Sequence, residues 1–250
     1  MPKKSNLLLL LILVSSNLFS QKLEVGMGVG PTYYKGDLQP NFRVFAPSVG
    51  TNAFVRYNFS KSVSIKGNGA FLNIKGNDAK SGNQYNTERG FKFSNTLIDY
   101  NGQIEYNFLN FRTHNGRYEH KWTPYLFGGF GMYKVLDSKL ESPEDTTPSD
   151  GKQSQYKMLP FGIGFKKIYK GKWNFGVEFS TRVLLDKNYQ DKFDGFGGIN
   201  TNTNNPNSRY RLPSTATLTD SFRYPNSPQK DLYYHVSFSV SYLFYKVHCP

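Results

Sequence analysis

The sequence lacks several features that would mark common protein classes. Its 250 residues include one cysteine, Cys249, which excludes an internal disulfide and a cysteine-based zinc site. After residue 20, no apolar run approaches the ~20 residues that a membrane-spanning helix needs, and the mean hydropathy is −0.56. A polytopic helical membrane protein is therefore excluded. A membrane β-barrel is not, because its strands are apolar on one face only.

Acidic residues are also scarce, since 18 Asp and Glu stand against 31 Lys and Arg, which gives a net charge of +13. The basic residues are scattered and form no stripe, so we expect no nucleic-acid partner. What the chain does have is aromatic side chains, at 16% of residues, and 23 glycines. This composition favours strands over helices.

Residues 1–20 have the layout of a secretory signal peptide. Lys3 and Lys4 precede an unbroken apolar run at 7–14, and cleavage after Ser20 would leave Gln21 as the new N-terminus. The run is short for a membrane anchor helix, which is the alternative. No cysteine stands at the cleavage site, so a lipoprotein is not expected. We therefore expect residues 21–250 to form one domain outside the cytoplasm.

The mature chain alternates apolar and polar residues in eight segments, which predicts an all-β fold. A period of two over about ten residues is typical of membrane-barrel strands. The segment 122–135 is apolar on both faces, so its orientation stays open. The eight segments are 23–30, 48–59, one beginning at 63, 98–108, about 122–135, 159–166, 173–182 and 232–244.

The connections between these segments alternate in length. Three are short, at 60–62, 109–121 and 167–172, and four are long, at about 35–47, 75–91, 136–156 and 185–230. Outer-membrane barrels have short periplasmic turns and long outer loops. The pattern predicts an eight-stranded antiparallel transmembrane β-barrel of the outer-membrane type, in contact with outer-membrane lipid, with both termini periplasmic.

Alternation alone does not say which face points inward, because a soluble lipocalin-type barrel would bury the apolar face. Aromatic residues near the strand ends, including Phe244, favour the membrane barrel. The polar face is also balanced in sign, as expected for charges that pair inside a narrow lumen. We expect a lumen filled by charged residues, glycine and asparagine, with no pore. Its charge network is predicted to comprise Glu24, Arg56, Lys66, Asp99, Glu105, Lys166, Glu178 and Arg182.

Two patterns resemble chemical sites. His235 and Ser237 resemble the catalytic pair of small outer-membrane lipid A deacylases, but they share the polar face and are expected to point into the lumen, away from an acyl chain. Asp186, Asp191 and Asp194 do not have the spacing of a calcium-binding loop, so a solvated loop is favoured. We expect no catalytic residues, cofactor or metal ion.

The connection 109–121 is longer than a hairpin needs. Its two histidines are a weak metal signal, and a solvated basic turn or a protein contact are the alternatives. We predict a periplasmic partner contact formed by Arg112, His114, Arg117, Tyr118, His120, Trp122 and Cys249.

An ordered set of segments resembles the PorG-type outer-membrane component of the type IX secretion and gliding machinery. The set covers nearly all of the mature chain, although the 185–230 loop does not match. Its members are 33–38 (YYKGDL), 55–59 (VRYNF), 105–108 (EYNF), 123–131 (TPYLFGGFG), 160–164 (PFGIG) and 172–178 (KWNFGVE), with Arg182 downstream.

The resemblance implies a non-enzymatic barrel that associates, on its periplasmic side, with a ring formed by a lipoprotein and its partner subunit. Two alternatives stay open. One is a surface adhesin or ligand-binding barrel that works through its outer loops, and the other is a lipid A-modifying enzyme, which would need a catalytic group facing lipid.

Overall fold

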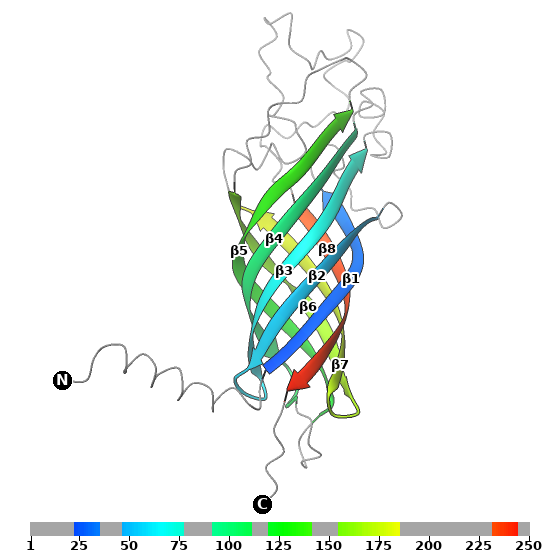
Figure 1. The fold of residues 1–250 in the computed structure, drawn as a ribbon. Coiled ribbons are helices and arrows are strands. Elements are labelled where there is room, and N and C mark those ends of the chain that lie inside the picture. Colours follow the sequence, from blue (N-terminus) through cyan, green and yellow to red (C-terminus); the bar gives the residue numbers. More distant parts are fainter. Residues whose placement is uncertain are drawn as a thin grey trace, which may run out of the picture.

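The computed structural model describes residues 23–35, 47–77, 92–111, 120–141, 155–185 and 232–244. These residues form a closed barrel in which each strand pairs with the next in antiparallel fashion and the last pairs with the first (Figure 1). The predicted eight-stranded barrel is confirmed. Its strands are β1 (Leu23–Lys35), β2 (Ser48–Asn58), β3 (Val63–Asn77), β4 (Lys92–Asn107), β5 (Trp122–Glu141), β6 (Gln155–Tyr169), β7 (Trp173–Leu184) and β8 (Leu232–Phe244).

Several strands extend further than the hydrophobic pattern indicated. β4 begins at Lys92 rather than at 98, β5 runs to Glu141 rather than to 135, and residues 33–35 belong to β1. Three of the four long connections are accordingly shorter than predicted, whereas the last, at 185–231, keeps its predicted length to within one residue. In the added segments most outward side chains are polar, as at Lys75 and Lys139, although Leu136 is also exposed. The backbone pairing continues there after the apolar–polar alternation has ended.

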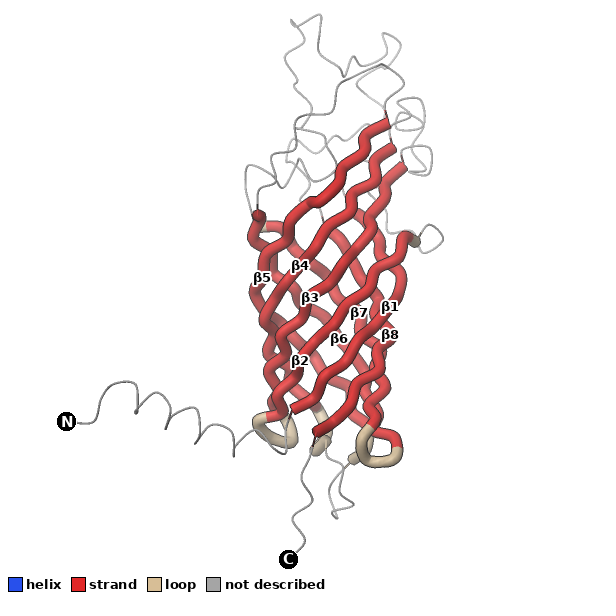
Figure 2. Tube along the Cα trace, viewed as in Figure 1, coloured by secondary structure: helices blue, strands red, loops and turns tan. Residues whose placement is uncertain are grey.

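The three short connections meet at one end of the barrel, which we call the short-turn end; the opposite end is the long-connection end (Figure 2). The barrel wall extends furthest toward the long-connection end in β3, β4 and β5. There Asn77 pairs with Lys92, and Lys92 pairs with Glu141. The barrel therefore has a raised wall on this side (Figure 1).

The apolar face of every strand points outward. Met27 is 71% exposed, Ile104 62% and Ile163 60%, while Glu24, Asp99 and Glu105 are fully buried. A lipocalin-type barrel has the opposite arrangement, so the soluble alternative is wrong. A continuous apolar outer wall around buried charges is suited to hydrocarbon rather than to water. Among the described residues, no helix is long and apolar enough to cross a membrane.

The orientation of β5, which the sequence left open, follows from its burial. Tyr125, Phe127 and Tyr133 point into the lumen, whereas Leu126 and Phe130 point outward. The register between β4 and β5 shifts between Thr96 and Leu97, which leaves Leu136 as an extra residue on β5. This bulge lies where the raised wall begins.

Candidate functional site: a filled lumen and the rim at its short-turn end

Glu105 on β4 is the centre of an ion network inside the barrel. Its carboxylate lies 2.9 Å from Arg56 Nε, 2.9 Å from Lys166 Nζ and 3.8 Å from Lys66 Nζ. These cations come from β2, β6 and β3, so the network crosses the lumen instead of following one strand. All four side chains are nearly or fully buried. A buried carboxylate surrounded by cations offsets much of the cost of removing each charge from water.

Glu178 on β7 continues the network across the barrel. Lys66 Nζ on β3 donates to Glu178 Oε2 at 2.5 Å, and the Tyr125 hydroxyl on β5 donates to the same oxygen at 2.9 Å. β3 and β7 stand opposite each other in the strand order. A direct bond between them shows that the lumen is spanned by side chains at this level.

Glu24 closes the network on the β1 side. Arg56 donates to Glu24 Oε1 at 2.6 Å and Asn174 Nδ2 donates to the same oxygen at 2.9 Å, while the Ser241 hydroxyl also donates to it. These six charged groups comprise three acids and three bases. The network is thus neutral as a whole, as the sequence balance indicated.

A second ion pair lies nearer the long-connection end. Arg182 Nε on β7 donates to Asp99 Oδ2 on β4 at 2.8 Å, and its Nη1 donates to the Ser180 hydroxyl at 2.5 Å. Asn101 donates to the other Asp99 oxygen at 3.1 Å. All eight residues named from the sequence as a charge network therefore lie inside the barrel, in two groups rather than one.

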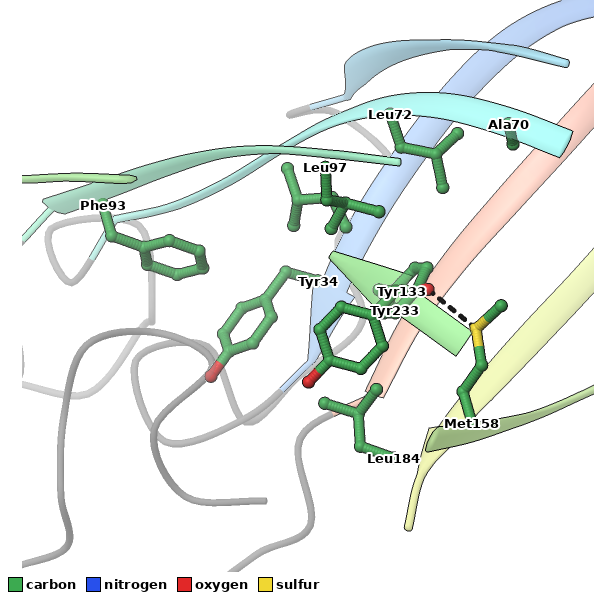
Figure 3. Close-up of a cluster of buried hydrophobic side chains, with 10 residues drawn as sticks. Tyr34, Ala70, Leu72, Phe93, Leu97, Tyr133, Met158, Leu184 and Tyr233 are labelled. Carbon is green, nitrogen blue, oxygen red and sulfur yellow. Dashed lines mark hydrogen bonds between the residues drawn. The ribbon is translucent and has the colours of Figure 1, made fainter. Parts of the chain in front are cut away.

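Beyond this pair, a cluster of buried hydrophobic side chains occupies much of the lumen, which the sequence analysis missed. Figure 3 shows the cluster, in which Tyr34 packs edge-to-face on Phe93 at 4.8 Å and the Tyr233 hydroxyl donates to Met158 Sδ at 3.1 Å. Every strand except β2 contributes to it. Its members are Tyr34, Ala70, Leu72, Ile74, Phe93, Leu97, Tyr133, Met158, Leu184 and Tyr233.

Phe111 lies at the opposite end of the lumen. It belongs to the connection between β4 and β5, yet it is buried, and Lys166 Nζ lies 5.1 Å from its ring centre. The Phe111 amide donates to the Lys61 carbonyl at 3.2 Å, and the residue bridges to His120. The base of the long turn is thus fixed beneath the ion network. Apolar side chains lie at both ends of a charged interior.

His235 and Ser237 lie where parity placed them, inside the barrel. Both are buried, and the Ser237 hydroxyl donates to Asn52 Oδ1 at 2.7 Å instead of to the imidazole. Among the described residues, His235 Nε2 has no hydrogen-bond partner. Phe238 on the same strand points outward, so the pair and the surface that faces lipid lie on opposite sides of β8.

Of the predicted partner-contact residues, the structure describes His120 and Trp122. Both are exposed, and their rings meet at 6.1 Å. Trp122 points outward and stacks on Phe165 at 5.8 Å. Arg112, His114, Arg117, Tyr118 and Cys249 lie outside the described residues, as do Ser20, Gln21 and the three aspartates at 186–194. Within the described part of the chain, no three acidic, histidine or cysteine side chains group as metal ligands would.

The comparison with protein families matches residues 3–250 to the domain of unknown function DUF6089. The chain belongs to this family. The match extends over the barrel and the segments between its strands, and the family description assigns no activity. No curated protein matches the chain significantly.

Solved structures with a similar arrangement include small bacterial barrels, all at low identity. Neisserial surface protein A has a TM-score of 0.46 at 8% identity, covering 89% of this chain and 97% of that one. The outer membrane protein OprG of Pseudomonas aeruginosa has 0.44 at 10%, covering 90% and 98%. The attachment invasion locus protein Ail of Yersinia pestis has 0.42 at 9%, covering 89% and 98%.

Proposed function

We propose that this chain is a non-enzymatic component of the type IX protein secretion machinery in the outer membrane. It associates on its periplasmic side with the ring formed by a lipoprotein and its partner subunit. The observation that carries the proposal is the filled lumen. Side chains cross it from β3 to β7, and apolar residues lie at both ends. A barrel without a conduit acts through its outer wall, its turns or its loops.

The ordered segments that resemble the PorG-type component support the choice of machinery. In this proposal the short-turn end faces the periplasm, and the contact is made by 112–119 with His120, Trp122 and Cys249. The base of that connection is held by hydrogen bonds: the His120 amide donates to the Asn110 carbonyl at 2.8 Å. The described base of the connection, 108–111 with 120–121, thus has a fixed position at the short-turn end.

A surface-binding role is the second candidate, and the raised wall favours it. The outward residues of β3, β4 and β5 there are mostly polar and include Lys75, Lys92 and Lys139. A sheet that rises beyond the apolar belt could hold the outer loops against a ligand. A lipid A-modifying activity gains no such support, because His235 and Ser237 point into the lumen.

The first experiment is a gentle purification of the affinity-tagged full chain from native outer membranes, with identification of bound proteins by mass spectrometry. We expect the ring lipoprotein and its partner subunit to co-purify. A second variant replaces 112–119 with a Gly-Ser segment of equal length, and this replacement should abolish the association.

The matched control replaces 36–46, at the other end of the barrel, with Gly-Ser of equal length and should retain the ring. A wild-type barrel that comes alone from well-preserved membranes contradicts the secretion role. Retention of the ring by the 112–119 variant contradicts the assigned contact while leaving the role itself standing.

A further inference from the structure

Four lysines gather at the short-turn end over the adjoining ends of β5, β6 and β7. Lys121, Lys167, Lys170 and Lys172 are all exposed. Lys167 is the register partner of Trp122, and the Ile168 amide donates to the Lys121 carbonyl at 2.7 Å. Tyr169 pairs with Trp173 across the turn 170–172, which carries the other two lysines. The four cations therefore lie on one sector of the barrel rim.

Aromatic rings accompany these lysines on the outer wall. Trp122 stacks on Phe165, Tyr169 meets Phe175 edge-to-face at 6.3 Å, and Trp173 meets Tyr242 at 5.3 Å. Lys167 stands between Phe165 and Tyr169 on the outward face of β6. Tryptophan and tyrosine at strand ends mark the level where hydrocarbon gives way to lipid head groups. Lysine at this level extends its ammonium toward the head groups.

The rim has no described acidic partner for its lysines. None of the described residues in the three short connections, 59–62, 108–111 with 120–121, and 170–172, is acidic. Lys170 moreover adopts a φ of 48°, a left-handed conformation in which Lys is unfavourable. Its Nζ lies 5.4 Å from the Tyr169 ring centre. A strained turn that presents a cation is an observation pointing to a function for that cation.

We propose that this rim, formed by Lys121, Lys167, Lys170 and Lys172 with Trp122 and Trp173, binds the head group of an anionic phospholipid, with phosphatidylglycerol as the probe. The phosphodiester lies among the ammonium groups, and the acyl chains lie against Phe165 and Phe175. An acidic protein surface is the weaker match, because Lys167 lies on the wall, between rings that face lipid. The proposal concerns the barrel alone and requires no secretion partner, although Trp122 also belongs to the proposed partner contact.

The experiment uses the fact that the chain has two tryptophans, both in this rim. The full chain is refolded into phosphatidylethanolamine vesicles that contain a small, fixed fraction of phosphatidylglycerol or phosphatidylethanolamine with brominated acyl chains. Tryptophan quenching then reports which lipid lies at the rim. We expect a relative binding constant for phosphatidylglycerol at least about threefold that of phosphatidylethanolamine, falling as salt is raised.

The variant K121Q/K167Q/K170Q/K172Q should lower this preference to about one, because the attraction of each lysine is removed. The single variant K167Q, which removes one charge from the wall, should lower it in part. The matched control K35Q/K75Q/K134Q/K157Q removes four charges near the long-connection end and should keep the wild-type preference. Heat-dependent gel mobility verifies that each barrel is folded.

Equal quenching by the two lipids in the wild-type chain overturns the proposal and leaves an acidic protein surface as the occupant. An equal loss of preference in the rim variant and in the control also overturns it, because the effect would then follow net charge rather than this site.

Discussion

At the scale of single residues, the lumen contains charged side chains that would each destabilise the fold if buried alone. As ion pairs they stabilise one another. Glu105 forms ion pairs with three cations. Removal of its charge therefore leaves the positive charges of Arg56, Lys66 and Lys166 only partly compensated. The two ends of the lumen are apolar, and water has little access to compensate. Within the network, this carboxylate is therefore expected to contribute most to the free energy of unfolding.

The substitution Glu105→Gln should lower the free energy of unfolding by about 3–5 kcal/mol, as when one partner of a buried ion pair is removed. Urea unfolding of the refolded chain in lipid vesicles, followed by tryptophan fluorescence, measures it. Asp137→Asn is the control, because its pair with Lys139 is exposed at 3.9 Å and should contribute less than about 1 kcal/mol. Equal effects of the two substitutions would argue against the network.

Neighbouring glycines on β5 provide a second test at this scale. A Cβ on Gly129 would collide with the Gly102 carbonyl oxygen of the adjacent strand, whereas a Cβ on Gly128 would meet nothing within 4 Å. We expect Gly129→Ala to cost about 1–3 kcal/mol, as in other overpacked sites, and Gly128→Ala to leave stability unchanged or raised. Unfolding midpoints compare the two variants, and a greater loss for Gly128→Ala would contradict the register.

The sequence could identify the buried charges because each alternates with apolar neighbours on its own strand. It could not identify Phe54 or Phe111 as lumen residues. Phe54 breaks the polar face of β2, yet its ring lies 4.9 Å from the Arg56 guanidinium, a contact that only the tertiary structure creates. Phe111 stands in a connection, where alternation carries no information.

At the scale of elements, the turn between β6 and β7 carries a strained residue. Lys170 and Gly171 both have positive φ, at 48° and 72°. Lysine in the left-handed region costs free energy that glycine does not.

The substitution Lys170→Gly should therefore raise the free energy of unfolding by up to about 1 kcal/mol. Lys172→Gly, in the same turn but without a positive φ, should give no gain, because glycine also adds freedom to the unfolded chain. Chemical unfolding of both variants measures the two changes in the free energy of unfolding. A loss of stability in Lys170→Gly would show that the left-handed conformation carries no strain.

Strand number and strand pairing could be predicted because eight alternating segments and their alternating connections leave few topologies. The ends of β3, β4 and β5 could not, because polar residues replace apolar ones in the raised wall while the hydrogen-bond ladder continues. The bulge at Leu136 could not be predicted either. Because β5 is apolar on both faces, its sequence has no apolar–polar alternation in which a shift of register would be visible.

At the scale of the whole molecule, an apolar outer wall encloses a charged interior with buried apolar side chains toward each end. The charges pair with one another, the hydrophobic cluster fills the long-connection end, and Phe111 lies at the other. Because described side chains span the lumen, we expect no route for solutes through it. Its activity is then expected at its surfaces, which is the premise shared by the proposed partner contact and the proposed lipid site.

Conductance across a planar lipid bilayer tests this premise most directly. The purified, folded full chain should insert without producing stable single-channel currents, even at high salt. Heat-dependent gel mobility of the chain recovered from lipid vesicles verifies that the barrel has inserted and is folded. Reproducible stepwise currents from the wild-type chain would contradict a filled lumen.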